Sequence, residues 1–175
     1  YHKRQRQLIK PAFYPQRIEE YAAIMVRCAE DEIGHWKDQE TININQAMTR
    51  ITLQVITRAM FGSVLDNEVI TEVGKNLSAA FSVMTTIIQN PLSLYCLERE
   101  IPLPIVRRFF TLKEALDKVI NSFIASYRKD TNRKTTDLLA MLMDAKDEET
   151  GTGMTDEQIR DEMMTFFIAG HETTT

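Results

Sequence analysis

Apolar residues recur every three to four positions along most of the chain, which is the spacing of one face of an α-helix. This pattern predicts helices over residues 15–37, 44–60, 67–89 and 106–130. No alternation of apolar and polar residues, the pattern typical of a half-buried β-strand, supports a sheet. The pattern therefore predicts an all-α fold.

Glycine and proline mark the expected helix ends. Gly62 is a predicted stop for the second helix, and Gly74 is expected to interrupt the third. Asn90 and Pro91 are expected to end that third helix. The segment 91–104 is apolar but contains three prolines, so we expect a loop with short turns there.

A further helix is expected to begin at Thr155, because Thr155 and Gln158 form a predicted capping box. At 3.6 residues per turn, this helix reaches Glu172 and Thr173 after roughly four to five turns. Most of its length is apolar, which predicts a buried helix. Gly170 within such a helix costs about 1 kcal/mol relative to alanine, so we expect something to approach the backbone closely there.

An acid and an alcohol stand side by side near the end of this helix. Thr173 lies one turn after Ala169, so its hydroxyl competes for the Ala169 carbonyl and opens a groove for water or a small ligand. Glu172 could connect that groove to solvent by a proton chain. The same residues are also typical of a polar, frayed helix end, and the residues alone leave both interpretations open.

The chain opens with a basic, helix-like stretch that Pro11 is expected to end. Arg6 lies one helical turn after His2, so both side chains share a face and could bind one anion. A basic run of this kind is also typical of a solvated helix face.

Together, the two ends resemble those of a cytochrome P450, a heme-thiolate monooxygenase. The opening is similar to that family's Trp-x-x-x-Arg helix before Pro-Ala-Phe, with Arg6 at the Arg position and His2 in place of the Trp. The segment 169–174 resembles the Ala/Gly-Gly-x-Asp/Glu-Thr-Thr signature of the helix that crosses the distal face of the heme. The segments 44–62 and 137–162 follow the family's order between these ends.

The resemblance implies heme as the cofactor, activation of dioxygen, and insertion of one oxygen atom into a substrate. The implied cofactor-binding residues are His2 and Arg6, at a heme propionate, and Ala169, Gly170 and Thr173. The implied catalytic residues, which deliver protons, are Glu172 and Thr173. The implied substrate-pocket residues are Thr165, Phe166 and Ala169. His171 points away from this face, so it is expected to pack or face solvent rather than bind iron.

The resemblance also implies partners. These are a small hydrophobic organic substrate, dioxygen, and an electron donor that is a reductase or a ferredoxin- or flavodoxin-type protein. Lys3, Arg4 and Lys10 are candidates for a basic surface that receives an acidic donor. The helices 67–89 and 106–130, with the segment between them, are implied to form a mobile lid over the substrate channel; an ordinary helical hairpin is the alternative.

By resemblance, residues 1–175 form an internal part of one cytochrome P450 domain, from the propionate-binding helix to the distal helix. The complete domain would add a small β region and a downstream loop whose cysteine binds the heme iron. Cys28 and Cys96 are expected to be buried thiols, since the chain has no Cys-x-x-Cys spacing. We therefore expect no metal ligand within this chain and no activity from it alone.

The composition of the chain excludes some classes of protein. The 175 residues are 43% hydrophobic, which is enough to build a core. The net charge of -4 argues against nucleic acid as a partner, and no apolar run approaches the roughly 20 residues that span a bilayer. The composition does not indicate a cellular compartment.

The competing interpretation is a non-catalytic all-α module that binds a ligand or regulates a partner. This interpretation explains the helices but not the two end motifs.

Overall fold

The computed structural model describes residues 2–62, 67–129 and 137–172, apart from the side chains of Asn67 and Glu172. All regular structure in these ranges is helical, which confirms the predicted all-α fold. The elements are α1 (His2–Ile9), the 3-10 helix η1 (Lys10–Phe13), α2 (Pro15–Ile33), α3 (Ile44–Phe61), α4 (Asn67–Gln89), α5 (Pro91–Glu98), α6 (Pro104–Lys129), α7 (Leu138–Asp144) and α8 (Asp156–Glu172). None of the described helices is long and apolar enough to cross a membrane.

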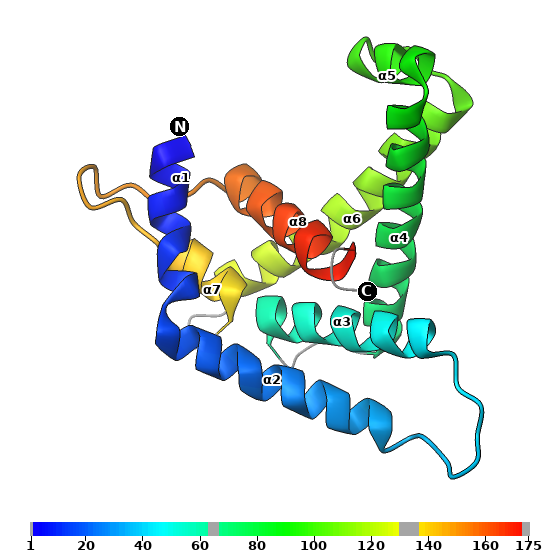
Figure 1. Cartoon of the computed structure of the whole chain (residues 1–175). Helices are drawn as coiled ribbons and strands as arrows, with labels where there is room; N and C mark the ends of the chain where they lie inside the picture. The colour runs from blue at the N-terminus through cyan, green and yellow to red at the C-terminus, as the bar shows by residue number, and fades with distance from the viewer. Residues whose placement is uncertain (1, 63–66, 130–136, 173–175) are drawn as a thin grey trace.

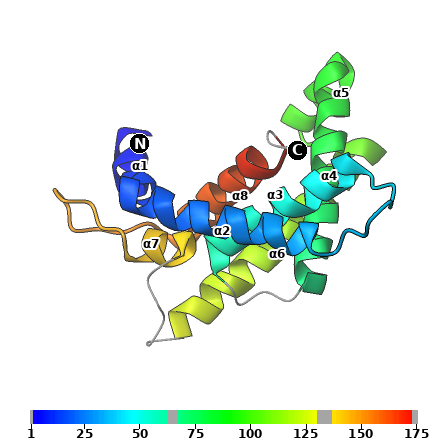
Figure 2. The ribbon, with the colours of Figure 1, turned by 60° about the horizontal axis from the view of Figure 1, so that its bottom comes forward.

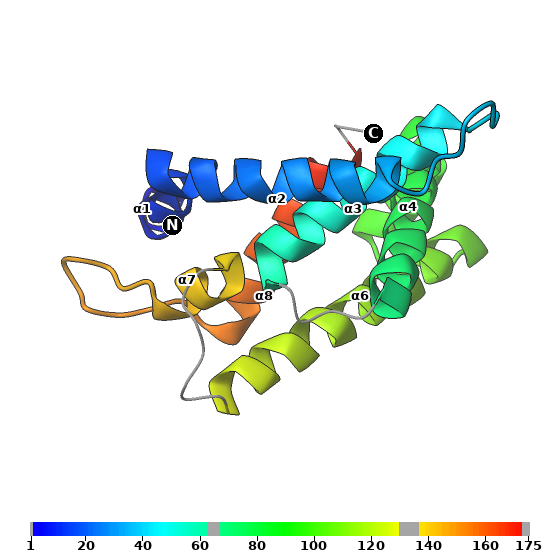
Figure 3. The same ribbon diagram turned by 90° about the horizontal axis from the view of Figure 1, so that it is seen from below.

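Helix α8 lies in the middle of the molecule, with α1 and α7 toward one side and α4 toward the other (Figure 1). Helices α2 and α3 pack on each other, and both α3 and α6 contact α8. Seen from below, the long α2 crosses the view in front of α3 and α8 (Figure 3). Helices α4 and α6 pack along each other and carry α5 away from the rest of the molecule (Figure 2). We call residues 85–110, around α5, the tip.

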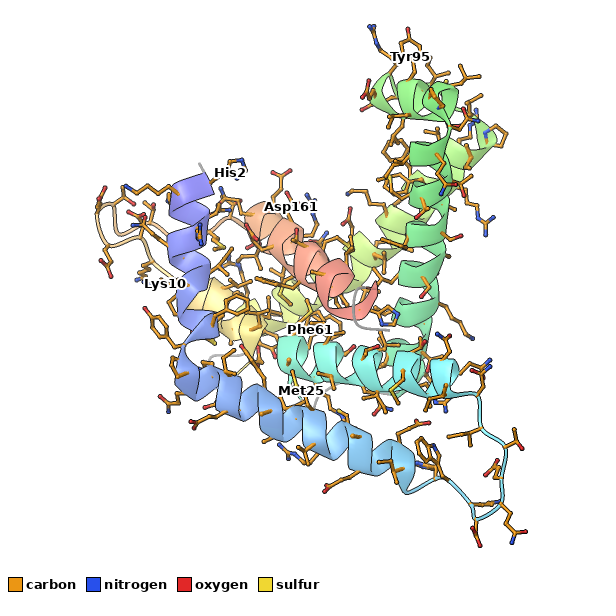
Figure 4. All side chains as sticks on the ribbon, viewed as in Figure 1. His2, Lys10, Met25, Phe61, Tyr95 and Asp161 are labelled. Atoms are coloured by element: carbon orange, nitrogen blue, oxygen red, sulfur yellow. The ribbon has the colours of Figure 1, made fainter. Side chains whose placement is uncertain are left out.

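The core lies where α3, α6, α7 and α8 meet, near the position of Phe61 in Figure 4. The Phe61 side chain is 1% exposed, and its ring centroid lies 4.6 Å from that of Phe123 and 5.7 Å from that of Phe167. Aromatic pairs at such distances add to the stabilisation that burial already gives. Other buried members of this core are Met60, Leu77, Leu116, Ile120, Leu139, Leu142, Ile159 and Met163. We call this region the junction.

The predicted helix bounds are close to the observed ones for three helices and too long for a fourth. Helix α4 has the predicted bounds, α3 ends one residue later than predicted, and α6 begins at Pro104 instead of Val106. Gly62 follows α3 with φ of 71°, which glycine adopts readily, so the predicted stop is confirmed. Helix α2 ends at Ile33 rather than Lys37, because the chain turns there and Trp36 N–H donates to Ile33 O.

The expected loop over 91–104 is wrong in its first half, where the structure has α5. Asn90 caps this helix, because its side-chain oxygen accepts hydrogen bonds from the backbone N–H groups of Leu92 (3.0 Å) and Ser93 (3.3 Å). Pro91 occupies the first helical position, where its missing N–H costs no hydrogen bond. Pro91, which was predicted to end one helix, therefore also begins the next one.

Of two other predictions from local sequence, the interruption at Gly74 is wrong and the capping box at Thr155 is confirmed. Gly74 does not interrupt α4; a Cβ at this position would overlap the Leu53 side chain, so glycine allows α3 and α4 to approach closely. The capping box is confirmed, since Thr155 N–H donates to Gln158 Oε1 (3.0 Å) and Gln158 N–H donates to Thr155 Oγ1 (3.2 Å).

Candidate functional site

Helix α8 has a buried face and an exposed face. Ile159, Met163 and Phe167 follow one another at intervals of four residues and are at most 2% exposed. Thr165 and Ala169, which are also four residues apart, are exposed. Because residues four apart share a face of a helix, α8 presents a separate surface that carries Thr165 and Ala169.

Gly170 lies on a different side of α8 from Ala169. A Cβ at Gly170 would come within 2.7 Å of Ile56 Cδ1, on α3. The close approach that the sequence predicts at Gly170 is therefore made by α3. A role for Gly170 beside a cofactor stays a prediction, whereas the exposed position of Ala169 leaves this small residue accessible to a ligand.

The other two predicted pocket residues make contacts within the chain. The Phe166 ring is half-buried, and its centroid lies 5.7 Å from that of Phe13 in η1. The Thr165 hydroxyl donates to the backbone oxygen of Asp161, one turn earlier in α8 (2.9 Å). Phe166 thus helps to hold α8 against the segment after α1, and its contact with substrate stays a prediction.

An apolar cavity of about 290 Å³ lies between α4, α6 and α8. It is lined by Leu77, Ala80, Phe81, Met84, Phe109, Lys113, Leu116, Met164 and Ile168. None of the predicted pocket residues lines this cavity; α8 contributes Met164 and Ile168 instead. The apolar spacing of these two residues in the sequence is a usable signal, but it does not say which side of α8 faces α4.

The one charged residue in the lining of this cavity is neutralised nearby. Lys113 Nζ lies 2.6 Å from Asp117 Oδ2, one turn along α6. Asp117 is also 3.7 Å from the Arg160 guanidinium of α8. The cavity therefore offers an apolar molecule a largely uncharged surface.

Helix α1 presents both predicted anion-binding residues on its exposed side. His2 and Arg6 are exposed, whereas Gln5 and Leu8 are buried on the other side of the helix. His2 is near enough to Glu162 of α8 to act on it: burial raises the pKa of Glu162, and the nearby His2 lowers it. The labelled His2 lies beside the first half of α8 in Figure 4. The arrangement keeps His2 and Arg6 accessible and places His2 close to α8.

Arg4 does not belong with the exposed basic residues. Its guanidinium donates to the backbone oxygens of Thr152 (3.2 Å) and Gly153 (2.9 Å) and to Thr152 Oγ1 (3.0 Å), and it lies 3.7 Å from Asp147. Arg4 therefore ties α1 to the loop that leads into α8. The role of Arg4 in a docking surface stays a prediction, and its contacts show a structural role as well; Lys3 and Lys10 are exposed.

His171 was expected either to pack or to face solvent, and the structure shows that it is packed. It is 1% exposed; its Nδ1 lies 3.3 Å from Thr52 Oγ1 of α3, and its Nε2 lies 3.4 Å from Ser78 Oγ of α4. The sequence analysis missed these partners, because Thr52 and Ser78 are 119 and 93 residues away along the chain.

The two predicted catalytic groups cannot be placed by their contacts. Helix α8 runs to Glu172, but the Glu172 side chain and all of Thr173 lie outside the described residues. Cys28 and Cys96 are buried free thiols, as predicted. Within the described ranges, no group of three or more His, Cys, Asp or Glu side chains could hold a metal ion.

Comparison with known proteins gives consistent results. The Cytochrome P450 family model matches residues 1–175. Cyclooctatin synthase and cyclooctat-9-en-7-ol 5-monooxygenase, both of Streptomyces melanosporofaciens, are 32% and 29% identical to this chain over 173 residues, which cover 99% of it and 37% of each relative. The crystal structure of the cytochrome P450DA heme domain is similar with a TM-score of 0.77 and 26% identity, over 95% of this chain and 35% of that one. The chain thus spans little more than a third of these proteins, and it belongs to the cytochrome P450 family.

Proposed function

We propose that the protein is a heme-dependent monooxygenase that inserts one oxygen atom of dioxygen into a small apolar substrate. The observation that carries this proposal is the exposed surface of α8, which presents Ala169, four residues before Thr173 in the sequence, while the opposite face of the helix is packed. Membership of the cytochrome P450 family supports the same chemistry. Within this function, residues 1–175 form an internal part of one domain and are inactive alone.

The residues present on this surface fit a heme. A flat, largely apolar ring needs a helix surface without large side chains, and the exposed Ala169 offers one. Its propionates need a cation and hydrogen-bond donors, which the exposed Arg6 and His2 on α1 supply. In the proposal, bound heme supplies the activation of dioxygen, and a cysteine outside this chain binds its iron.

The chain's own contribution is placement and protons. The Thr173 hydroxyl donates a proton toward the site of reaction, and Glu172 passes protons to it from solvent. Gly170 acts indirectly, because it allows α3 to hold α8 closely at this turn. The family signature over 169–174 supports these roles.

The cavity between α4, α6 and α8 supports an apolar substrate. Its lining is hydrophobic except for Lys113, which is paired with Asp117. Ile168 lines the cavity and is adjacent to Ala169, so a molecule there lies next to the proposed heme surface. Thr165, Phe166 and Ala169 remain proposed pocket residues on the neighbouring side of α8.

The electron donor is proposed to be a reductase or a ferredoxin- or flavodoxin-type protein. The exposed Lys3 and Lys10 offer positive charge to an acidic donor, since complementary charge accelerates encounter. Replacing both by Glu should slow reduction by the donor without changing heme content. Reduction at an unchanged rate would contradict this part of the proposal.

Isotope labelling tests the reaction directly. The full-length protein, supplied with heme, an electron-donor system and cyclooctat-9-en-7-ol as a trial substrate, should place one labelled oxygen atom from ¹⁸O₂ into a product. Thr173→Ala should lower the product formed per dioxygen consumed, and Thr173→Ser should recover it. A heme-loaded protein that reduces dioxygen but shows no dependence on Thr173 would contradict the proposed proton delivery.

A further inference from the structure

We propose that His171 is a positioning residue, which fixes the last turn of α8 against α3 and α4 and thereby places Glu172 and Thr173 for proton delivery. This inference rests on the proposed function. It concerns the variable position of the family signature, between Gly170 and Glu172.

The imidazole of His171 bridges two helices from different parts of the chain. Its Nδ1 lies 3.3 Å from Thr52 Oγ1 on α3, and its Nε2 lies 3.4 Å from Ser78 Oγ on α4. The residue is 1% exposed, so its ring nitrogens depend on protein partners rather than bulk water. Both ring nitrogens have a hydroxyl within reach, which fixes the rotation of the ring.

Each hydroxyl can form a hydrogen bond with the ring nitrogen beside it, as donor or as acceptor according to the tautomer of the ring. The Thr52 hydroxyl also donates to the backbone oxygen of Thr49 (3.1 Å), and its oxygen can accept from a ring N–H at the same time. The end of α8 is thus linked through His171 to a hydroxyl on each neighbouring helix.

The two sides of this bridge differ in packing. Toward α3, α8 packs too closely at Gly170 to leave space for a side chain, since a Cβ there would lie 2.7 Å from Ile56 Cδ1. Toward α4, the apolar cavity begins beside the bridge: Leu77, next to Ser78, and Ile168, one turn before His171, both line it. The Ser78 contact therefore joins the two helices that border the cavity, and a displacement of α4 reaches the turn before Glu172.

Single hydroxyl deletions test the bridge without removing the buried ring. Ser78→Ala deletes the α4 contact at an exposed residue, and Thr52→Val deletes the α3 contact with little change of shape. Ser82→Ala is the matched control, because Ser82 is an exposed serine one turn further along α4. All three variants are made in the full-length, heme-containing protein.

Hydrogen–deuterium exchange is the first readout, because it does not depend on activity. Loss of one ordinary hydrogen bond changes a local opening equilibrium by roughly two- to tenfold. Backbone amides of His171 to Thr174 should therefore exchange roughly two- to tenfold faster in Ser78→Ala and Thr52→Val, and at the wild-type rate in Ser82→Ala. Exchange in Ser78→Ala that equals that of Ser82→Ala would overturn the proposal.

The second readout is hydrogen peroxide released per NADPH consumed, with a ferredoxin and its reductase as donor and adamantane as an apolar probe. Misplaced proton delivery should raise this ratio severalfold in Ser78→Ala relative to Ser82→Ala. Faster exchange without extra peroxide would overturn the role in proton delivery. A protein that takes up no heme contradicts the proposed function instead, and the exchange comparison in that protein still decides whether His171 holds α8.

Discussion

The junction and the tip are both built from α-helices, but they differ in how much of their apolar surface is covered. At the junction, Phe61 and Phe167 are at most 2% exposed and α3, α6, α7 and α8 meet. At the tip, Ile88, Leu92 and Tyr95 are 59%, 66% and 51% exposed. Regions with few buried apolar contacts open at a lower free energy than a core does. Because the tip also has buried apolar residues, among them Ile87 and Val106, we predict only that it opens at a lower free energy than the junction.

This difference divides the lid that the family resemblance predicts into two parts: the tip carries exposed apolar side chains, whereas Leu77 of α4 and Leu116 of α6 belong to the junction. A lid must move while the groups that deliver protons stay in place, so the two functions need regions of unequal stability. Helix α8 belongs to the junction, and the cavity beside it is bordered by α4 and α6 on the other side.

The largest expected effect is the loss of an aromatic ring at the junction. Phe61→Ala should lower the free energy of unfolding by about 3–5 kcal/mol, because it leaves a cavity next to Phe123 and Phe167. Leu92→Ala at the tip should change it by less than about 0.5 kcal/mol, because Leu92 is largely exposed. Urea unfolding measures both variants, and similar losses would remove the distinction between the two regions.

Removal of a helix cap should also lower the free energy of unfolding by different amounts in the two regions. This difference should be smaller than the one between Phe61→Ala and Leu92→Ala. Asp137 is 8% exposed; it accepts a hydrogen bond from Ala140 N–H at the start of α7 (2.9 Å) and lies 2.9 Å from the Tyr127 hydroxyl. Asp137→Ala should cost about 1–2 kcal/mol of unfolding free energy, whereas Asn90→Ala, at the exposed cap of α5, should cost about 0.5 kcal/mol. Thermal unfolding of the pair, with Asp137→Asn as the cap-retaining control, tests the order; a larger loss at Asn90 would reverse it.

A still smaller effect on the free energy of unfolding is expected where α2 packs on α3, and this effect should depend on pH. The hydrogen bond from Arg50 holds the pKa of Glu32 below its ordinary value of 4.5. This pair therefore stabilises the fold above that pH, and its contribution disappears as the pH falls through the folded-state pKa. Glu32→Gln should cost about 1 kcal/mol at neutral pH and progressively less in acid. Unfolding curves across this pH range measure the difference, and a constant loss would show that the charge of Glu32 is not responsible.

The parts of the fold that sequence analysis predicted depend on neighbours in the chain. Apolar spacing predicts the bounds of α4, and the pair Thr155 and Gln158 predicts the start of α8, because both signals act within one or two turns. Pro91 was ambiguous, since proline is compatible both with the end of one helix and with the first position of the next.

The parts that the sequence could not predict depend on contacts between distant segments. The spacing along α8 does not say that Met164 and Ile168, rather than Thr165 and Ala169, face the cavity beside α4. Likewise, the partners of His171 lie on α3 and α4, far away in the sequence. In the sequence, Arg4 is one of several basic residues near the start of the chain, and nothing there predicts its contact with the loop before α8.

The carbon monoxide difference spectrum of the reduced, heme-supplied full-length protein tests the central claim most directly. A monooxygenase of the proposed kind should give the red-shifted Soret band of a thiolate-bound heme. A folded protein that takes up no heme, or one whose band lacks this shift, would contradict the claim and favour a non-catalytic helical module that binds an apolar ligand.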